Sequence, residues 1–108
     1  MNVFYLDRNP KKAAYMHCDK HVVKMVLEYA QILSTAHRVV DGDEVADREG
    51  LYNLTHKNHP STAWARSSRG NYNWLSDLWG HLGDEYTHRY GKVHKASTKD
   101  WLFHAPKY

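Results

Sequence analysis

One stripe of polar residues between Asp19 and Val40 brings together side chains suited to acid–base chemistry. His21, Lys24 and Glu28 follow one another at spacings of three and four residues, which place them on one face of a helix. A carboxylate flanked by an amine and an imidazole can exchange protons with a substrate, and a desolvated lysine can form a Schiff base. The pattern also fits the solvated face of an amphipathic helix, with Lys24 and Glu28 as an ordinary ion pair. The stripe continues through Gln31, Thr35 and Arg38.

A second cluster lies where a later helix is expected to begin, in the run NHPSTAWARSSRGNYNW. Arg66 and Arg69 are one helical turn apart, and Asn71 follows them. The amino end of a helix attracts anions, and arginine forms bidentate contacts with phosphate. We therefore expect Arg66, Arg69 and Asn71 to bind phosphate groups, with a solvated polar face as the alternative.

A third cluster surrounds the expected end of that helix, in the run EYTHRYGKVHK. Cations at the carboxyl end of a helix are stabilised by the helix dipole alone, so a structural reading and a phosphate-binding reading are both open. Lys20, at the start of the polar stripe, is grouped with them as a phosphate ligand. The other members of this predicted set are Arg89, Lys92, His94 and Lys95.

Metal and cofactor sites have little support in the sequence. His17 and His21 have the spacing of two ligands on one helix, and His59 could supply a third. A helix boundary expected at Asp19 separates the first two, so no residue is assigned to a metal. The glycine-rich phosphate loops of nucleotide-binding proteins are absent, as is the GxSxG motif of hydrolases, and no cofactor is expected.

Length and charge narrow the class of protein further. A chain of 108 residues forms one domain, here residues 1–108, and leaves room only for a shallow active site. The net charge is +3, but five of the twelve acidic residues lie between Asp41 and Glu49. The remainder has 14 basic and 7 acidic residues, a balance that favours phosphate-containing partners. Without an apolar span or a signal peptide, and with Cys18 alone, we expect a cytoplasmic protein with no membrane contact.

The elements that position these residues are predicted to be helices. A short helix begins at Pro10 behind Asn9 and ends near His17, and a long one runs from a cap at Asp19 to Val40. Residues 41–58, the acidic segment, are expected to form one long irregular loop. A later helix begins at Pro60 with Ser61 or Thr62 as its cap, breaks near Gly70 and stops at Gly91, and the basic tail folds back onto the core. The predicted fold is an all-α, compact helical bundle.

Three segments carry a resemblance to a known group of proteins: CDKHVVKMVLEYAQ, NHPSTAWARSSRGNYNWL and DEYTHRYGKVHK. Together they resemble a family of small phage-encoded proteins. The order of features is also similar to that of bacteriophage pyrimidine-dimer DNA glycosylases of the endonuclease V type. Those proteins pair an Asp-x-His with a catalytic Glu seven residues after the His, as Asp19, His21 and Glu28 do here. A later match comprises Trp74-Leu75, Glu85 and Arg89-Tyr90-Gly91.

The resemblance implies a DNA glycosylase and lyase that acts on damaged pyrimidines in the infected host cell. In that family an amino-terminal α-amine attacks the sugar, and the helix glutamate supports strand cleavage, which is the role implied for Glu28. His21 and Lys24 would assist it. Because Asn2 is not small, Met1 is expected to remain, and its α-amine is the candidate nucleophile. Lys20 or Lys24 is the alternative amine, and the resemblance implies that Arg66, Arg69 and Lys92 hold phosphates of distorted DNA.

Two other classes of function remain open at this stage. The protein can be a non-catalytic binder of nucleic acid or of a small nucleotide, such as a host signalling nucleotide that a phage sequesters. It can also be an interaction protein that blocks a host factor, with the basic surface facing an acidic partner. Glu28 on the polar stripe favours the enzyme, while the retained Met1 favours a binder.

Overall fold

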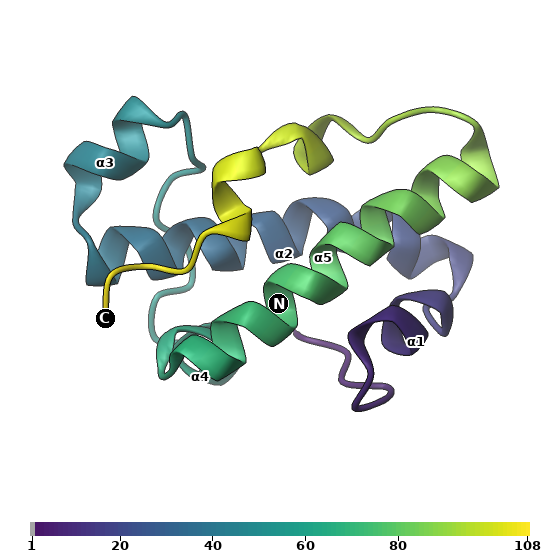
Figure 1. Ribbon diagram of the computed structural model, residues 1–108, viewed down its shortest axis with the longest axis horizontal. Coiled ribbons are helices and arrows are strands. Elements are labelled where there is room, and N and C mark those ends of the chain that lie inside the picture. The colour runs from purple at the N-terminus through teal and green to yellow at the C-terminus, as the bar shows by residue number, and fades with distance from the viewer. Residues whose placement is uncertain (1) are drawn as a thin grey trace.

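The computed structural model describes residues 2–108, and every regular element in that range is a helix. Five α-helices precede two short 3-10 helices near the carboxyl end (Figure 1). The predicted all-α fold is therefore confirmed. The elements are α1 (Pro10–Tyr15), α2 (Asp19–Val40), α3 (Asp43–Arg48), α4 (Pro60–Arg66), α5 (Arg69–Tyr90), η1 (Lys95–Thr98) and η2 (Asp100–Phe103).

The two long helices, α2 and α5, run antiparallel across the molecule and enclose most of its core (Figure 1). Arg89 at the end of α5 bonds to Asp19 at the start of α2, with 2.9 Å between Nη1 and Oδ1. At the opposite end, the Tyr72 hydroxyl on α5 lies 2.8 Å from His37 Nε2 on α2. Trp79 is fully buried between these two contacts. The apolar stripes of both helices supply most of the other large core side chains, which include Val22, Val26, Tyr29, Leu33, Leu75, Leu78 and Leu82.

The ends of α1 and α2 agree closely with the sequence prediction. The Asn9 side chain accepts a hydrogen bond from the Lys11 N–H at 2.9 Å and so caps α1, as expected. The long helix ends at Val40, also as predicted. Its start differs slightly, because Asp19 is the first helical residue and Cys18 occupies the cap position. The carboxylate of Asp19 consequently faces the positive end of the helix dipole.

The ends of α4 and α5 show one correction. His59 caps α4, because its Nδ1 accepts a hydrogen bond from the Ser61 N–H at 3.1 Å, and neither Ser61 nor Thr62 takes that role. The predicted break in the later helix exists, and Ser68 opens α5 with a side-chain cap. The predicted stop at Gly91 is confirmed. Its φ of 69° lies in the left-handed region, which glycine adopts without steric cost.

The acidic segment, residues 41–58, differs from the single irregular loop that the sequence predicts. It contains a short helix, α3. Its carboxylates Asp43 and Asp47 lie on one face and both accept hydrogen bonds from Arg38 Nη1, at 3.0 and 2.9 Å. The same buried guanidinium donates to the backbone carbonyls of Leu51 and Tyr52. The hydrogen bonds from Arg38 stabilise this helix, although the local sequence favours a turn. Arg38 therefore holds the acidic segment against α2 and does not belong to a solvated polar face.

The C-terminal tail folds back onto the core, as predicted. Leu102 of η2 is fully buried, and the tail packs along α5 (Figure 1). Two glycines of α5 permit this close approach. A Cβ atom at Gly80 would lie 2.8 Å from the Phe103 ring, and one at Gly83 would lie 3.0 Å from Ser97 Cβ. Packing against the tail thus favours glycine at both positions, which offsets its poor helix propensity.

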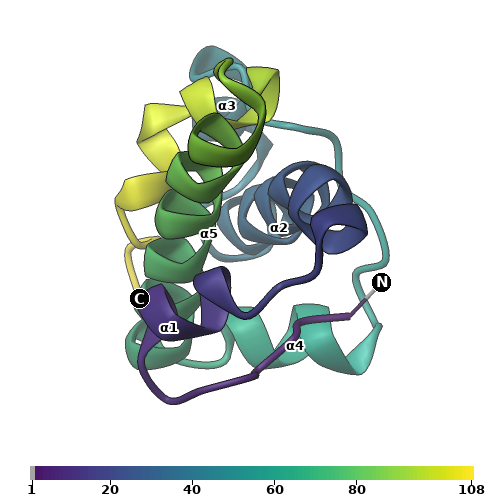
Figure 2. The same cartoon turned by 90° about the vertical axis from the view of Figure 1, so that its right-hand side faces the viewer.

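Residues 2–8 form an extended N-terminal segment that runs past α4 and α2 (Figure 2). The Phe4 N–H donates a hydrogen bond to the Tyr29 hydroxyl oxygen at 3.1 Å, which fastens the segment to α2. The Tyr5 ring stacks on Trp74 of α5, with 4.3 Å between ring centroids. Successive side chains of the segment thus point to opposite sides, toward α2 and toward the α4–α5 junction.

Candidate active site

The three residues predicted to carry acid–base chemistry line one small polar pocket. His21, Lys24 and Glu28 meet there on the exposed face of α2, where the N-terminal segment crosses the helix. The cavity has a volume of about 90 Å³. Met1, the predicted nucleophile, lies outside the described residues, but Asn2 borders the pocket. The full lining is Asn2, Phe4, His21, Lys24, Met25 and Glu28.

Glu28 is the most enclosed charged group of this pocket. Its side chain is 18% exposed, and Oε2 is buried without a hydrogen-bond partner among the described residues. Lys24 Nζ lies 3.8 Å from that oxygen, which is within ion-pair range but too long for a hydrogen bond. The Lys24 side chain itself is 62% exposed. A buried carboxylate oxygen with a free lone pair can accept a proton or a hydrogen bond from a bound ligand.

His21 is oriented by the N-terminal segment. Its ring stacks on Phe4, with 4.3 Å between centroids and 17° between planes. Phe4 is in turn held by the hydrogen bond from its N–H to the Tyr29 hydroxyl oxygen. The pocket is therefore a composite of one helix face and a segment at least 17 residues earlier in the sequence, as the separation of Phe4 and His21 shows. Helical periodicity identified the helix face but contains no signal for the second wall.

His17, whose spacing from His21 fits a pair of metal ligands, has both ring nitrogens engaged within the protein. Nδ1 lies 2.6 Å from the Ala13 carbonyl oxygen, and Nε2 lies 2.8 Å from the Tyr29 hydroxyl. Burial lowers the pKa of His17 below its usual value, the hydrogen bond to Ala13 opposes this shift, and the nearby His21 and Arg89 side chains lower the pKa further. Within residues 2–108, no three His, Cys, Asp or Glu side chains gather in a way that could hold a metal ion.

Four exposed lysines lie on α2 and on the turn that His94 attaches to it, and we call them together the lysine surface. His94 attaches the turn before η1 to α2, because its Nε2 lies 3.2 Å from the Val23 carbonyl oxygen. Its Nδ1 accepts the Ala96 N–H at 3.0 Å, so the two ring nitrogens of this predicted phosphate ligand are used within the protein. The exposed lysines on either side of this contact remain available to a partner. They are Lys20 and Lys24 on α2, and Lys92 and Lys95 around the turn.

The other predicted phosphate ligands lie far from the lysine surface. Arg66 and Arg69 are at the α4–α5 junction, about 30 Å along α5 from its carboxyl end. Arg66 Nη1 donates to the Lys57 carbonyl oxygen at 2.7 Å, and the Arg69 guanidinium lies 5.9 Å from the centroid of the Tyr108 ring. Asn71 donates to backbone and side-chain oxygens of the same junction. The predicted phosphate ligands thus form two groups and not one continuous patch.

Arg89 has the structural role that the sequence left open beside phosphate binding. Its guanidinium makes four hydrogen bonds within the protein, to the carboxylates of Glu85 and Asp19 and to the carbonyl oxygens of Tyr15 and His17. The Glu85 carboxylate raises its pKa further, although burial opposes that shift. The residue fastens the end of α5 to the α1–α2 connection. We therefore do not place it among the phosphate-binding groups.

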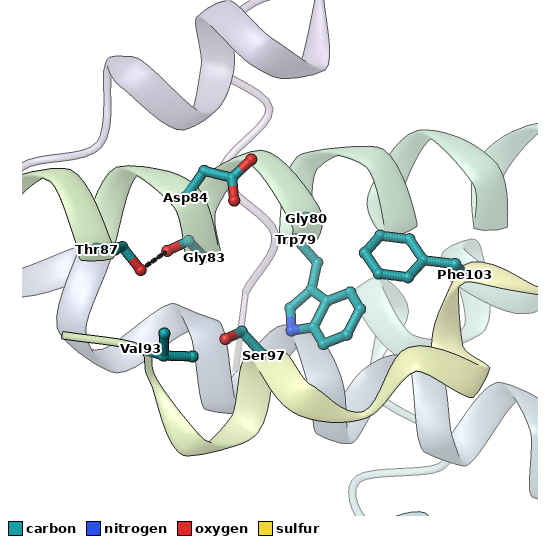
Figure 3. A pocket seen from close by; sticks show the side chains of 8 residues that line it. All are labelled: Trp79, Gly80, Gly83, Asp84, Thr87, Val93, Ser97 and Phe103. Carbon is teal, nitrogen blue, oxygen red and sulfur yellow. Dashed lines mark hydrogen bonds between the residues drawn. The ribbon is translucent and has the colours of Figure 1, made fainter.

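Two of the larger pockets outside the polar one involve the C-terminal tail and the N-terminal segment. A cavity of about 430 Å³ separates α5 from the C-terminal tail (Figure 3). Its hydroxyl groups are occupied, since Thr87 donates to the Gly83 carbonyl oxygen and Ser97 to that of His94. Asp84 lies at its edge. A larger cavity of about 670 Å³ lies beside the N-terminal segment and is lined by Val3, Tyr5, Pro60, Ser61, Trp64 and Asn71.

Comparison with known proteins adds no assignment. No protein-family model matches the chain, and no significant match exists among curated proteins or solved structures. Within residues 2–108, no helix is both long enough and apolar enough to cross a membrane.

Proposed function

We propose that the protein is a DNA glycosylase and lyase that acts on damaged pyrimidines. The observation that carries the proposal is the convergence of Glu28, His21 and Lys24 on one pocket at the N-terminal segment. This pocket supplies a largely buried carboxylate, an imidazole and an amine within one small space. The lysine surface beside it supplies the positive charge that a DNA backbone requires.

The chemistry needs an amine nucleophile and a carboxylate. The amine attacks C1′ of the damaged nucleotide, and a nitrogen–carbon bond forms as the glycosidic bond breaks. The base leaves with the electron pair of that bond and takes up a proton. Loss of the amine proton and opening of the sugar give a Schiff base. Glu28 then removes a proton from C2′, and the 3′ carbon–oxygen bond breaks to release the phosphate end.

Two amines are candidates for the nucleophile. Lys24 Nζ borders the pocket and lies 3.8 Å from Glu28 Oε2. The α-amine of Met1 is the other candidate, and the position of Asn2 in the pocket lining supports it. Hydrolysis of the Schiff base by water frees either amine for another turnover.

The test is a cleavage and trapping assay. A labelled duplex with one thymine dimer and its undamaged twin are each incubated with the protein and borohydride. We expect strand cleavage and a covalent adduct with the damaged duplex alone, and peptide mass spectrometry of the adduct distinguishes Lys24 from the amino terminus. Glu28→Gln should retain DNA affinity and lose strand cleavage by at least 100-fold, on the order of general-base contributions. Glu44→Gln, on the exposed side of α3, is the control.

Absence of both cleavage and adduct would refute the enzyme proposal. Cleavage by Glu28→Gln at the wild-type rate would refute the role of that carboxylate. In the first case, binding assays with small nucleotides would test the alternative that the protein is a non-catalytic binder.

A further inference from the structure

The largest of the cavities described above shares a wall with the polar pocket. Asn2 and Phe4 line the polar pocket, whereas Val3 and Tyr5 line the cavity of about 670 Å³. Successive side chains of an extended chain point to opposite sides, so these two pairs face different cavities. The N-terminal segment therefore stands between the cavities. The cavity volume lies in the range of roughly 300–1,000 Å³ that is typical of small-molecule sites.

The walls of this cavity present aromatic surface. Trp64 of α4 lines it, and its ring meets that of Trp74 edge to face, with 6.1 Å between centroids. Trp74 covers one face of the Tyr5 ring, yet Tyr5 remains 53% exposed. The opposite face of Tyr5 is therefore accessible to a planar ligand. Open aromatic faces of this kind stack with nucleobases irrespective of sequence.

Two polar side chains can pair with the edge of such a ligand. The Asn71 amide nitrogen donates to the Trp64 carbonyl oxygen at 2.9 Å and to Ser67 Oγ at 3.0 Å. Because both amide hydrogens are used, the carbonyl oxygen of Asn71 is left as an acceptor. The Ser61 hydroxyl adds a group that both donates and accepts.

Positive charge flanks the aromatic walls. Arg8 is adjacent to the cluster, since its carbonyl oxygen accepts the Trp74 indole N–H at 2.8 Å. The Arg8 side chain is exposed and can meet a phosphate attached to a base held in the cavity.

We propose that this cavity, the aromatic pocket, binds a nucleobase close to the nucleotide that reacts at Glu28. Three steps of extended chain from Asn2 to Tyr5 span about 10 Å. A stacked strand advances about 3.4 Å per nucleotide, so a base within three positions of the reacting nucleotide reaches the aromatic pocket. The choice of a nucleobase as the ligand rests on the proposed function. The binding test uses free nucleotides, so its result can refute base binding in the aromatic pocket without refuting the enzyme activity, and the reverse.

The test follows the four tryptophan indole N–H signals in a nitrogen-15 correlation spectrum. Deoxyadenosine and thymidine 5′-monophosphates should shift the signals of Trp64 and Trp74. Trp79, which is buried in the core, and Trp101 of η2 serve as internal references. Ribose 5-phosphate is the control ligand, because it has the sugar phosphate but no base, and it should leave all four signals in place.

A variant pair links the shifts to stacking. Tyr5→Ala should weaken nucleotide binding by about 5- to 150-fold, the factor that corresponds to a stacking energy of 1–3 kcal/mol. Tyr15→Ala, at an exposed tyrosine on α1, should leave the affinity unchanged. Equal shifts with ribose 5-phosphate, or unchanged Trp64 and Trp74 signals at millimolar nucleotide, would overturn the aromatic pocket even if damaged DNA is cleaved. Clear nucleotide shifts with no DNA cleavage would support the pocket and refute the enzyme proposal.

Discussion

The hydroxyl of Tyr29 joins the buried imidazole of His17 to the N-terminal segment. With Nδ1 of His17 protonated and donating to the Ala13 carbonyl, Nε2 accepts the Tyr29 hydroxyl proton at 2.8 Å. The Tyr29 oxygen then accepts the Phe4 N–H at 3.1 Å. Each donor in this chain has an acceptor when His17 is neutral. The polar pocket therefore depends on a buried hydrogen-bond chain that lies beside it and does not touch its ligand.

Removal of the Tyr29 hydroxyl should destabilise the protein. Tyr29→Phe leaves the Phe4 N–H and His17 Nε2 without a partner in a buried setting, and we expect the free energy of unfolding to fall by about 1–3 kcal/mol. Urea denaturation followed by circular dichroism measures this change. Tyr86→Phe is the matched control, because Tyr86 is also buried and its hydroxyl makes no hydrogen bond within the described residues. An equal loss in both variants would contradict the role of the hydrogen-bond chain.

The stability of the protein should fall in mild acid. Burial lowers the pKa values of His17 and His37, and for His37 the Asp41 carboxylate only partly opposes the shift. The unfolded chain, with histidine pKa values of about 6.5, therefore takes up these protons first as the pH falls. The neutral imidazoles contribute fully to the free energy of unfolding above about pH 6.5. Below that pH the contribution is lost, by up to about 1.4 kcal/mol per pH unit for each histidine.

Urea titrations between about pH 7.5 and 5.5 measure this dependence, and the range stays above the ordinary titration of carboxylates. His17→Gln keeps an acceptor for Tyr29 and removes one titrating group. It should therefore show a shallower loss of stability across the same range. A stability that is constant or rises toward pH 5.5 would contradict the prediction.

Loss of Arg38 should release the acidic segment. Arg38→Met leaves the carbonyl oxygens of Leu51 and Tyr52 without their donor, and we expect at least about 2 kcal/mol of destabilisation. Amide hydrogen exchange should increase within α3 more than within α5. Arg48→Met, at an exposed arginine of α3, should change the stability by less than about 0.5 kcal/mol. Unchanged exchange in α3 after loss of Arg38 would show that other contacts hold the segment.

The lysine surface should set the salt dependence of DNA binding. Replacement of both Lys20 and Lys95 by alanine should lower affinity for damaged and undamaged duplexes alike. The slope of log affinity against log salt should fall by about two, since each phosphate contact contributes about 0.9. Replacement of both Arg48 and Lys107, with the same change in charge at the opposite end of α2, is the control. Equal slopes for the two double variants would place the DNA elsewhere.

The sequence predicts the long helices well and short contacts between segments poorly. The boundary of α2 at Val40 and the stop at Gly91 follow from local chemistry, namely apolar periodicity and a residue that tolerates positive φ. α3 was missed because its acidic residues resemble a turn, and its helix is stabilised by Arg38 from another element. A pattern along the chain does not contain that information.

The same distinction applies to the candidate site. Spacing alone brings His21, Lys24 and Glu28 to one face, because three- and four-residue steps are a property of a single helix. The contribution of Phe4 depends on a hydrogen bond to a tyrosine 25 residues away. The separation of the two arginine clusters also follows from a single helix. The sequence places Arg69 and Arg89 at the two ends of one expected helix, and α5 holds them at opposite ends of the molecule.

The position of the N-terminal segment between two cavities has a thermodynamic consequence. A movement of the shared wall toward α4 enlarges the space beside Glu28 and reduces the space beside Trp64, and the reverse movement does the opposite. Any ligand that prefers one position of the wall changes the affinity of the other cavity. Linkage requires the effect to be reciprocal and of equal size in both directions. If the two proposed sites are both occupied, their ligands would therefore be coupled through residues 2–5, which form part of the lining of each cavity.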